Sequence, residues 1–185
     1  MSQSKRIFLG VAIATLWVGS MALSACAAPD RSAKAENPAR SPRNFDTQEM
    51  LEAHNEWRSR VGVPPLSWSE DLADYAEQWA QQLADRGFDM EHRPNNRYGE
   101  NIYWSAGRSA SPTDVVNSWG EEVADYNYQN NTCDGVCGHY TQVVWENTQE
   151  VGCAVVRGTH PEYRTQEVWV CNYNPPGNYV GERPY

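Results

Sequence analysis

Positive charge and long apolar runs are both scarce in this chain of 185 residues. Lys and Arg together number 15 against 24 Asp and Glu, and the formal net charge at pH 7 is −9. An acidic chain with scattered Lys and Arg repels phosphate backbones, which argues against nucleic-acid binding. One long apolar run lies near the N-terminus and no second one follows, so the sequence excludes a multi-span membrane protein.

Two further absences narrow the class of protein. No sequence period of about 20 to 50 residues recurs, which argues against a repeat architecture. No Gly-x-Ser-x-Gly motif is present, so the serine nucleophile of the α/β hydrolases is missing.

The N-terminal segment predicts export. Lys5 and Arg6 precede an apolar run that ends in Leu23-Ser24-Ala25-Cys26, and this order is typical of a secretory signal over residues 1–25. Leu23–Cys26 also resembles a bacterial lipobox, which would make Cys26 a lipidated first residue. We expect a cell-envelope lipoprotein that touches the membrane only through this anchor. Cleavage after Ala27, giving a secreted protein, is the alternative.

Composition then divides the rest of the chain. Residues 26–44 are mostly Ala, Pro, Ser, Arg, Lys and Asn without apolar periodicity, which predicts a disordered tether. Residues 45–185 have a single-domain length, with enough apolar residues for one core.

Helices are predicted first along this domain and strands second. Apolar side chains recur at spacings of three and four over residues 45–61, 67–87 and 111–123. Ser67 and Glu70 fit a capping box for the second helix, and Pro112 suits the first turn of the third. Short runs rich in Val, Tyr, Trp and Thr follow at residues 140–145, 151–156 and 167–173, which predicts an antiparallel meander. Helices followed by strands indicate an α+β class.

Four cysteines remain once Cys26 is set aside: Cys133, Cys137, Cys153 and Cys171. An even number in an exported chain predicts two disulfides, and the sequence alone allows three connectivities. Cys133, Cys137 and His139 could instead begin a zinc site. A closed zinc site needs four ligands, however, and an oxidising compartment favours disulfides.

His139 opens the first predicted strand. Alternation would place it on one face with Thr141 and Val143, at the entrance of a cleft. An isolated histidine at such a position is more often structural than a ligand or a base.

Five motifs occur in the order typical of one known family. They are Ala53-His54-Asn55-x-x-Arg58, Gly99-Glu100-Asn101-Ile102, Trp119-x-x-Glu122-x-x-x-Tyr126-x-Tyr128, Gly138 to Trp145, and Cys171-Asn172-Tyr173-x-Pro175-x-Gly177-Asn178. On these motifs the chain resembles the CAP superfamily (cysteine-rich secretory proteins, antigen 5 and pathogenesis-related protein 1), in particular its plant and bacterial pathogenesis-related-1-like members. The resemblance implies a three-layer α-β-α sandwich around a small antiparallel sheet.

The resemblance also implies a cleft lined by His92, Glu100, Glu122 and His139. At one of these positions the chain departs from the family pattern, because Arg93 follows His92 where the family commonly has Ser. Two neutral imidazoles could bind zinc or another divalent cation, with the carboxylates orienting the rings. The family pattern further implies disulfides between Cys153 and Cys171 and between Cys133 and Cys137.

Three functions are compatible with such a cleft. The leading prediction is a non-enzymatic binding module that holds a divalent cation or a small ligand, with a lipid or sterol as a further candidate. It requires no cofactor, and the sequence identifies no protein partner. The first alternative is a hydrolase or protease in which a Glu–His pair acts as general base. The second is a structural protein of the envelope, in which the four side chains form a buried polar network.

Overall fold

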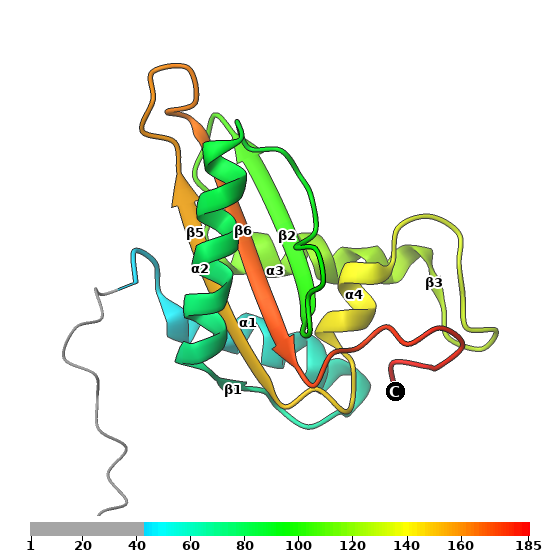
Figure 1. Cartoon of the computed structure of the whole chain (residues 1–185). Coiled ribbons are helices and arrows are strands. Elements are labelled where there is room, and N and C mark those ends of the chain that lie inside the picture. Colours follow the sequence, from blue (N-terminus) through cyan, green and yellow to red (C-terminus); the bar gives the residue numbers. More distant parts are fainter. Residues whose placement is uncertain (1–42) are drawn as a thin grey trace, which may run out of the picture. The chain divides into compact units, whose positions relative to one another are not determined.

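The computed structural model describes residues 43–185, which form a central sheet covered by helices on both faces (Figure 1). The elements are α1 (Thr47–Val61), β1 (Ser67–Trp68), α2 (Glu70–Asp85), β2 (Gly99–Ala106), α3 (Pro112–Gly120), the 3-10 helix η1 (Glu121–Asp125), β3 (Tyr126–Asn127), β4 (Thr132–Cys133), α4 (Gly138–Val143), β5 (Glu150–Arg157) and β6 (Gln166–Asn174).

The main sheet has the strand order β1-β5-β6-β2. Strand β6 pairs antiparallel with both β5 and β2, whereas the two residues of β1 pair parallel with β5. The strands predicted at residues 151–156 and 167–173 are therefore confirmed as β5 and β6. Strand β2 was quoted as a motif but not predicted as a strand, and it forms one edge of the sheet.

Alternating side chains of the strands supply two separate cores. On one face, Ala154, Val168 and Val170 pack with the buried stripe of α2. On the other face, Trp169 and Tyr173 pack with α1, α3 and α4. This arrangement confirms the three-layer α-β-α sandwich, because apolar side chains cover both faces of the sheet.

The prediction of a strand over residues 140–145 is wrong. Residues Gly138–Val143 form the short helix α4, so His139, Thr141 and Val143 do not share a strand face. The β-branched and aromatic composition favoured a strand, but tertiary contacts at both ends of the segment override that preference. The Glu122 carboxylate accepts from the N–H of His139, and Arg58 donates to the carbonyl of Val143.

The ends of the three longer helices follow local capping chemistry. Asp46 caps α1, which ends at Gly62 in the left-handed conformation. The capping box proposed at Ser67 is wrong, because Ser67 pairs with β5 and Ser69 caps α2 instead. Ser111 starts α3 with a capping box, as its sequence predicts. The α-helical part of α3 is shorter than predicted, because residues 121–125 continue it as a 3-10 helix.

Several predictions concern residues outside the described part of the chain. The signal peptide, the lipobox with Cys26 and nearly all of the tether lie there. The last two tether residues are described: Arg43 forms ion pairs with Glu70 and Glu77 of α2, and Asn44 donates to the carbonyl of Val155. None of the helices within residues 43–185 is long and apolar enough to cross a membrane.

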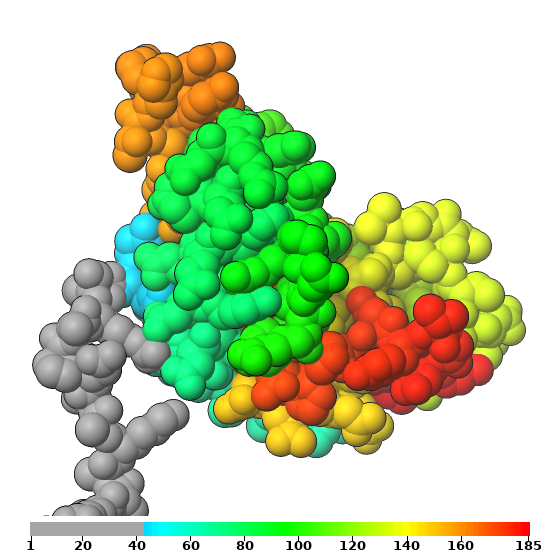
Figure 2. Space-filling model, in the orientation of Figure 1, coloured from blue at the N-terminus to red at the C-terminus, as the bar shows by residue number. Residues whose placement is uncertain are grey.

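The C-terminal segment lies over the hairpin formed by β3 and β4 (Figure 2). Asn131 donates to the carbonyl of Glu182, and Arg183 donates to the carbonyl of Gln129. Near the chain end, the Tyr185 ring stacks on Tyr128 with ring centroids 4.7 Å apart. The tail therefore ends as an ordered cap rather than as another strand.

Candidate functional site

His139 and Glu122 form the first of two His–Glu pairs. The Nδ1 of His139 lies 2.6 Å from Glu122 Oε1, and it is the donor because a carboxylate accepts. The imidazole is stacked on the indole of Trp119, with an interplanar angle of 18°. Its Nε2 has no hydrogen-bond partner among residues 43–185, and the side chain is 28% exposed. The ring is thus fixed at one nitrogen and open at the other.

The helix that carries His139 is held at both ends. At its start, Glu122 Oε2 accepts from the N–H groups of His139 and Tyr140. At its end, the buried guanidinium of Arg58 donates to the carbonyls of Val143 and Trp145, at 3.0 and 2.8 Å. A negative charge at the N-terminus and a positive charge at the C-terminus both complement the dipole of α4. A six-residue helix that would be marginal alone is stabilised in this way.

His92 and Glu100 form the second pair. The Nδ1 of His92 donates to Glu100 Oε1 at 2.8 Å, and this hydrogen bond raises the pKa of His92. The Glu100 side chain is only 4% exposed and also accepts from the N–H of Arg93 and the amide of Asn96. The His92 side chain is 65% exposed, and its Nε2 again has no partner in the described part of the chain.

Both pairs adjoin the edge strand β2. Glu100 belongs to this edge strand, and the next residue, Asn101, donates through Nδ2 to the carbonyl of His139 at 3.1 Å. A cavity of about 300 Å³ adjoins the first pair, and its lining residues are Met90, Ile102, Tyr103, Trp104, Ser118, Trp119, Glu122 and His139. Met90 belongs to the same loop as His92. The four predicted residues therefore form two ordered pairs that flank the edge strand β2, where the side chains of Glu100 and Asn101 point to opposite faces of the sheet.

The four side chains do not form a closed metal site. Within residues 43–185, the only three His, Cys, Asp or Glu side chains with potential ligand atoms mutually within 4.8 Å are His54, Cys153 and Cys171. A cation bound by the pairs would take its remaining ligands from solvent or from another molecule. The donor set nevertheless suits a cation, because each imidazole keeps Nε2 free while a carboxylate holds Nδ1.

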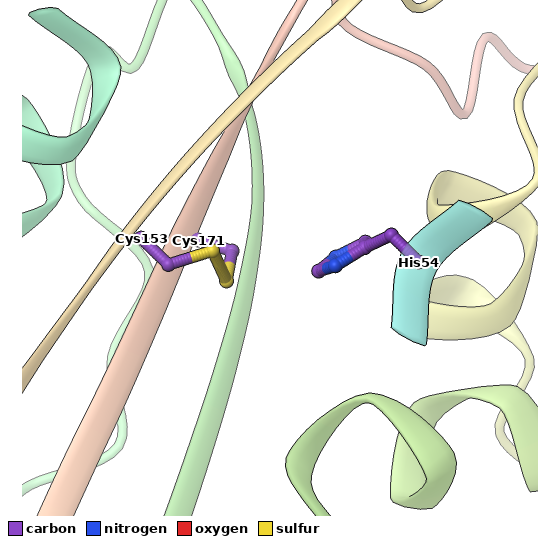
Figure 3. Close-up of side chains that lie close together, drawn as sticks. All are labelled: His54, Cys153 and Cys171. Carbon is purple, nitrogen blue, oxygen red and sulfur yellow. A yellow bond between two sulfur atoms is a disulfide. The ribbon is translucent and has the colours of Figure 1, made fainter. Parts of the chain in front are cut away.

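His54 and the two cysteines are a structural cluster (Figure 3). Cys153 and Cys171 form a disulfide between neighbouring strands, so their sulfurs are not thiolates. His54 Nδ1 donates to the carbonyl of Met50, and its Nε2 accepts from the hydroxyl of Tyr173. With both nitrogens occupied, His54 offers no metal ligand. A second disulfide joins Cys133 to Cys137, so both pairings implied by the resemblance are present.

Sequence reasoning missed the residues that support the two pairs. Arg58 and Asn101 were part of quoted motifs but were given no role, although both contact α4. Arg93 was noted only as a departure from the family pattern. Met90 and Trp104, which are 48% and 43% exposed, were not connected with the site. Because these contacts join residues far apart in the chain, no local pattern reveals them.

Comparison with known proteins agrees with the fold and its motifs. Residues 51–173 match the cysteine-rich secretory protein (CAP) family. Pathogenesis-related protein 1 of Arabidopsis thaliana is 46% identical over 138 residues, which cover 75% of this chain and 81% of the relative. Pathogenesis-related protein PR-1 of Medicago truncatula is 44% identical over 150 residues, or 77% and 80% of the two chains. These relatives are plant proteins, so a bacterial source stays a prediction.

Solved structures of other proteins share the fold of this chain. The venom allergen-like protein 4 of Schistosoma mansoni superposes with a TM-score of 0.59 at 28% identity, covering 75% of this chain and 92% of that one. The structure of NaASP2 with Zn²⁺ superposes with a TM-score of 0.62 at 24% identity, covering 79% and 90%, and this likeness concerns the fold alone. From the match over residues 51–173 and the plant relatives, the chain belongs to the CAP (cysteine-rich secretory protein) family.

Proposed function

We propose that this protein is a non-enzymatic binding module whose two His–Glu pairs hold a divalent cation such as zinc. One observation carries the proposal. In both pairs the carboxylate accepts a hydrogen bond from the Nδ1–H of the imidazole, and Nε2 has no partner among residues 43–185. A carboxylate behind a histidine is the usual support of a zinc ligand, because it fixes the tautomer and increases the basicity of Nε2.

The proposal assigns separate roles to the four residues. His92 and His139 would donate to the cation through Nε2, while Glu100 and Glu122 orient them. Since the protein supplies two ligands, we expect weaker binding than at a closed site with four. The remaining positions would be open to water or to a small ligand. The apolar cavity beside His139 would accept the apolar part of such a ligand, for which a lipid or sterol is a candidate.

Zinc titration by isothermal calorimetry tests the cation site. The wild-type chain should bind zinc, and the double variant His92→Ala, His139→Ala should not. Glu122→Gln should weaken binding by about 10-fold, as substitutions behind a metal ligand commonly do. His160→Ala is the matched control, because His160 is an exposed histidine on the loop between β5 and β6. Equal binding by the wild type and the double variant would refute the proposal.

The two alternative functions have less support. Among the described residues, no Ser, Thr or Cys side chain hydrogen-bonds to His92 or His139, so a hydrolase would have to activate water directly. Cleavage of a peptide library that is lost on Glu122→Ala would favour the hydrolase. A purely structural role would leave zinc unbound by the wild-type chain.

We also propose that the protein is exported and anchored to the cell envelope through Cys26. The order of basic, apolar and small residues before Cys26 supports this, although it lies outside the described residues. The two disulfides support export independently, because such bonds persist mainly in oxidising compartments. Release as a secreted protein is the alternative outcome.

A further inference from the structure

The two histidines are positioned by different kinds of structure. His139 lies on a helix that Glu122 and Arg58 hold at its two ends, and its carbonyl is bound by Asn101. His92 lies instead on the irregular segment 86–98, which connects α2 to β2. Its side chain is more than twice as exposed as that of His139, at 65% against 28%. Side-chain contacts between this segment and the neighbouring elements must therefore set its position.

Arg93, the next residue, attaches this segment to α2. Its guanidinium lies over the ring of Tyr75, 3.6 Å from the centroid, and donates to the carbonyl of the same residue at 2.9 Å. It also reaches the side-chain oxygen of Gln78, one turn further along α2, at 3.5 Å. At the other end of the residue, the backbone N–H of Arg93 donates to Glu100 Oε1 at 2.9 Å. Arg93 thus joins α2 to the carboxylate oxygen that also holds His92.

The chemistry of these contacts is specific to arginine. The partners of the guanidinium are a ring face, a carbonyl oxygen and an amide oxygen, all of them neutral. A planar cation can stack on a ring and donate from its edge at the same time, which a lysine ammonium cannot do. A serine, which the family commonly has here, would keep the backbone N–H but lose every contact with α2.

We propose that Arg93 is a positioning residue that holds the His92 segment on α2 and so sets the imidazole of His92 against Glu100. The inference rests on the proposed function as far as the cation is concerned. Two other side-chain hydrogen bonds hold the segment on either side of Arg93. Trp79 donates to the carbonyl of Glu91 before it, and Asn96 donates to Glu100 after it. Without Arg93, the residues between these two points have no side-chain contact with α2 among the described interactions.

Two measurements on Arg93→Ser test the proposal, one of them independent of any metal. In the apo protein, hydrogen exchange of the Arg93 backbone amide, which donates to Glu100, should accelerate at least about 5-fold, while exchange in α4 stays unchanged. Zinc should bind about 10-fold more weakly, with the affinity of Arg93→Lys between those of Arg93→Ser and the wild type. The matched control is Arg97→Ser, which removes an exposed arginine from the same segment whose guanidinium lies over Tyr98.

The outcomes separate this inference from the proposed function. If the wild-type chain binds no zinc, the proposed function fails, and hydrogen exchange still decides the role of Arg93. Equal exchange in Arg93→Ser and Arg97→Ser would overturn the positioning role. Acceleration over the whole domain would overturn it as well, because it would indicate general destabilisation. Tyr75→Leu is a second variant that removes the stacked ring, and it should reproduce the local acceleration.

Discussion

Two buried ionisable side chains of α1, Arg58 and His54, are held by neutral hydrogen-bond partners rather than by opposite charges. Arg58 is fully buried, and its guanidinium donates to the carbonyls of residues 64, 143, 145, 146 and 148. Burial lowers its pKa to about 10, so it keeps its charge at neutral pH. His54 is buried as completely, and burial lowers its pKa to about 4. The two residues share one helix face but differ in charge, because only the guanidinium remains protonated when desolvated.

His54 makes stability depend on pH in a defined direction. Its pKa is about 4 in the folded protein and about 6.5 when unfolded, so the unfolded chain binds the proton more tightly. The contribution of His54 to the free energy of unfolding is therefore fully present above pH 6.5, and it falls by up to about 3 kcal/mol as the pH drops towards 4. Urea unfolding at intervals between about pH 4 and 7 should show this loss, and His54→Gln should remove it.

The effect of His92 on the pH dependence of stability is opposite to that of His54, so His92 serves as an internal comparison. Its pKa is raised by the hydrogen bond to Glu100, so its contribution is present below its unfolded pKa and disappears as the pH rises through the folded value. His92→Asn should therefore leave the acidic loss unchanged. Parallel profiles for the wild type and His54→Gln would contradict the assignment to His54.

Among the elements, α4 determines where His139 lies, and its structure depends on contacts from elsewhere in the chain. Cys137 provides no side-chain cap at its start. The carboxylate of Glu122, from the preceding 3-10 helix, accepts both the N–H of His139 and that of Tyr140. One residue therefore orients the imidazole and starts the helix that carries it.

Replacing Glu122 by Ala should lower the free energy of unfolding by about 2 kcal/mol. Two backbone N–H groups and the His139 Nδ1–H would lose their acceptor, and the helix terminus would lose a complementary charge. Glu121→Ala provides the control, since Glu121 is adjacent, acidic and exposed, and we expect a change within about 0.5 kcal/mol. Urea unfolding measures both; similar losses in the two variants would show that Glu122 has no capping role.

The sequence predicts correctly those elements that local residues specify, and it fails for an element that depends on distant contacts. Helix α3 is readable because Ser111, Pro112 and Asp114 specify its start locally. Strands β5 and β6 are readable because their Val, Trp and Tyr residues are buried between two layers. Helix α4 has a strand-like composition and is fixed by Glu122 and Arg58, so local pattern reasoning assigned it wrongly. The motifs named the two histidines and the two glutamates, but the pairing of each histidine with its glutamate and the roles of Arg93 and Asn101 required the three-dimensional structure.

At the scale of the whole molecule, the five cysteines fall into two classes. Cys153 and Cys171 join the two central strands, with 18 residues of separation, and Cys133 and Cys137 close a loop with a separation of 4. Loop-closure entropy makes the first bond worth about 3 kcal/mol and the second about 2 kcal/mol. Cys26 is the first residue of the predicted tether, outside the described residues, and is proposed to carry the lipid.

Matched cysteine variants should separate these two classes. In cells supplied with a clickable palmitate analogue, Cys26→Ser should abolish labelling and move the protein from the membrane fraction to the medium. Both disulfides should stay closed in this variant, because they join the other four cysteines. The double variant Cys153→Ala, Cys171→Ala should keep the label but lose about 3 kcal/mol in the free energy of unfolding, since the constraint on the unfolded chain is gone. If Cys26→Ser kept the acyl label, the anchor would be misassigned, and an unlabelled wild type found in the medium would identify a secreted protein instead.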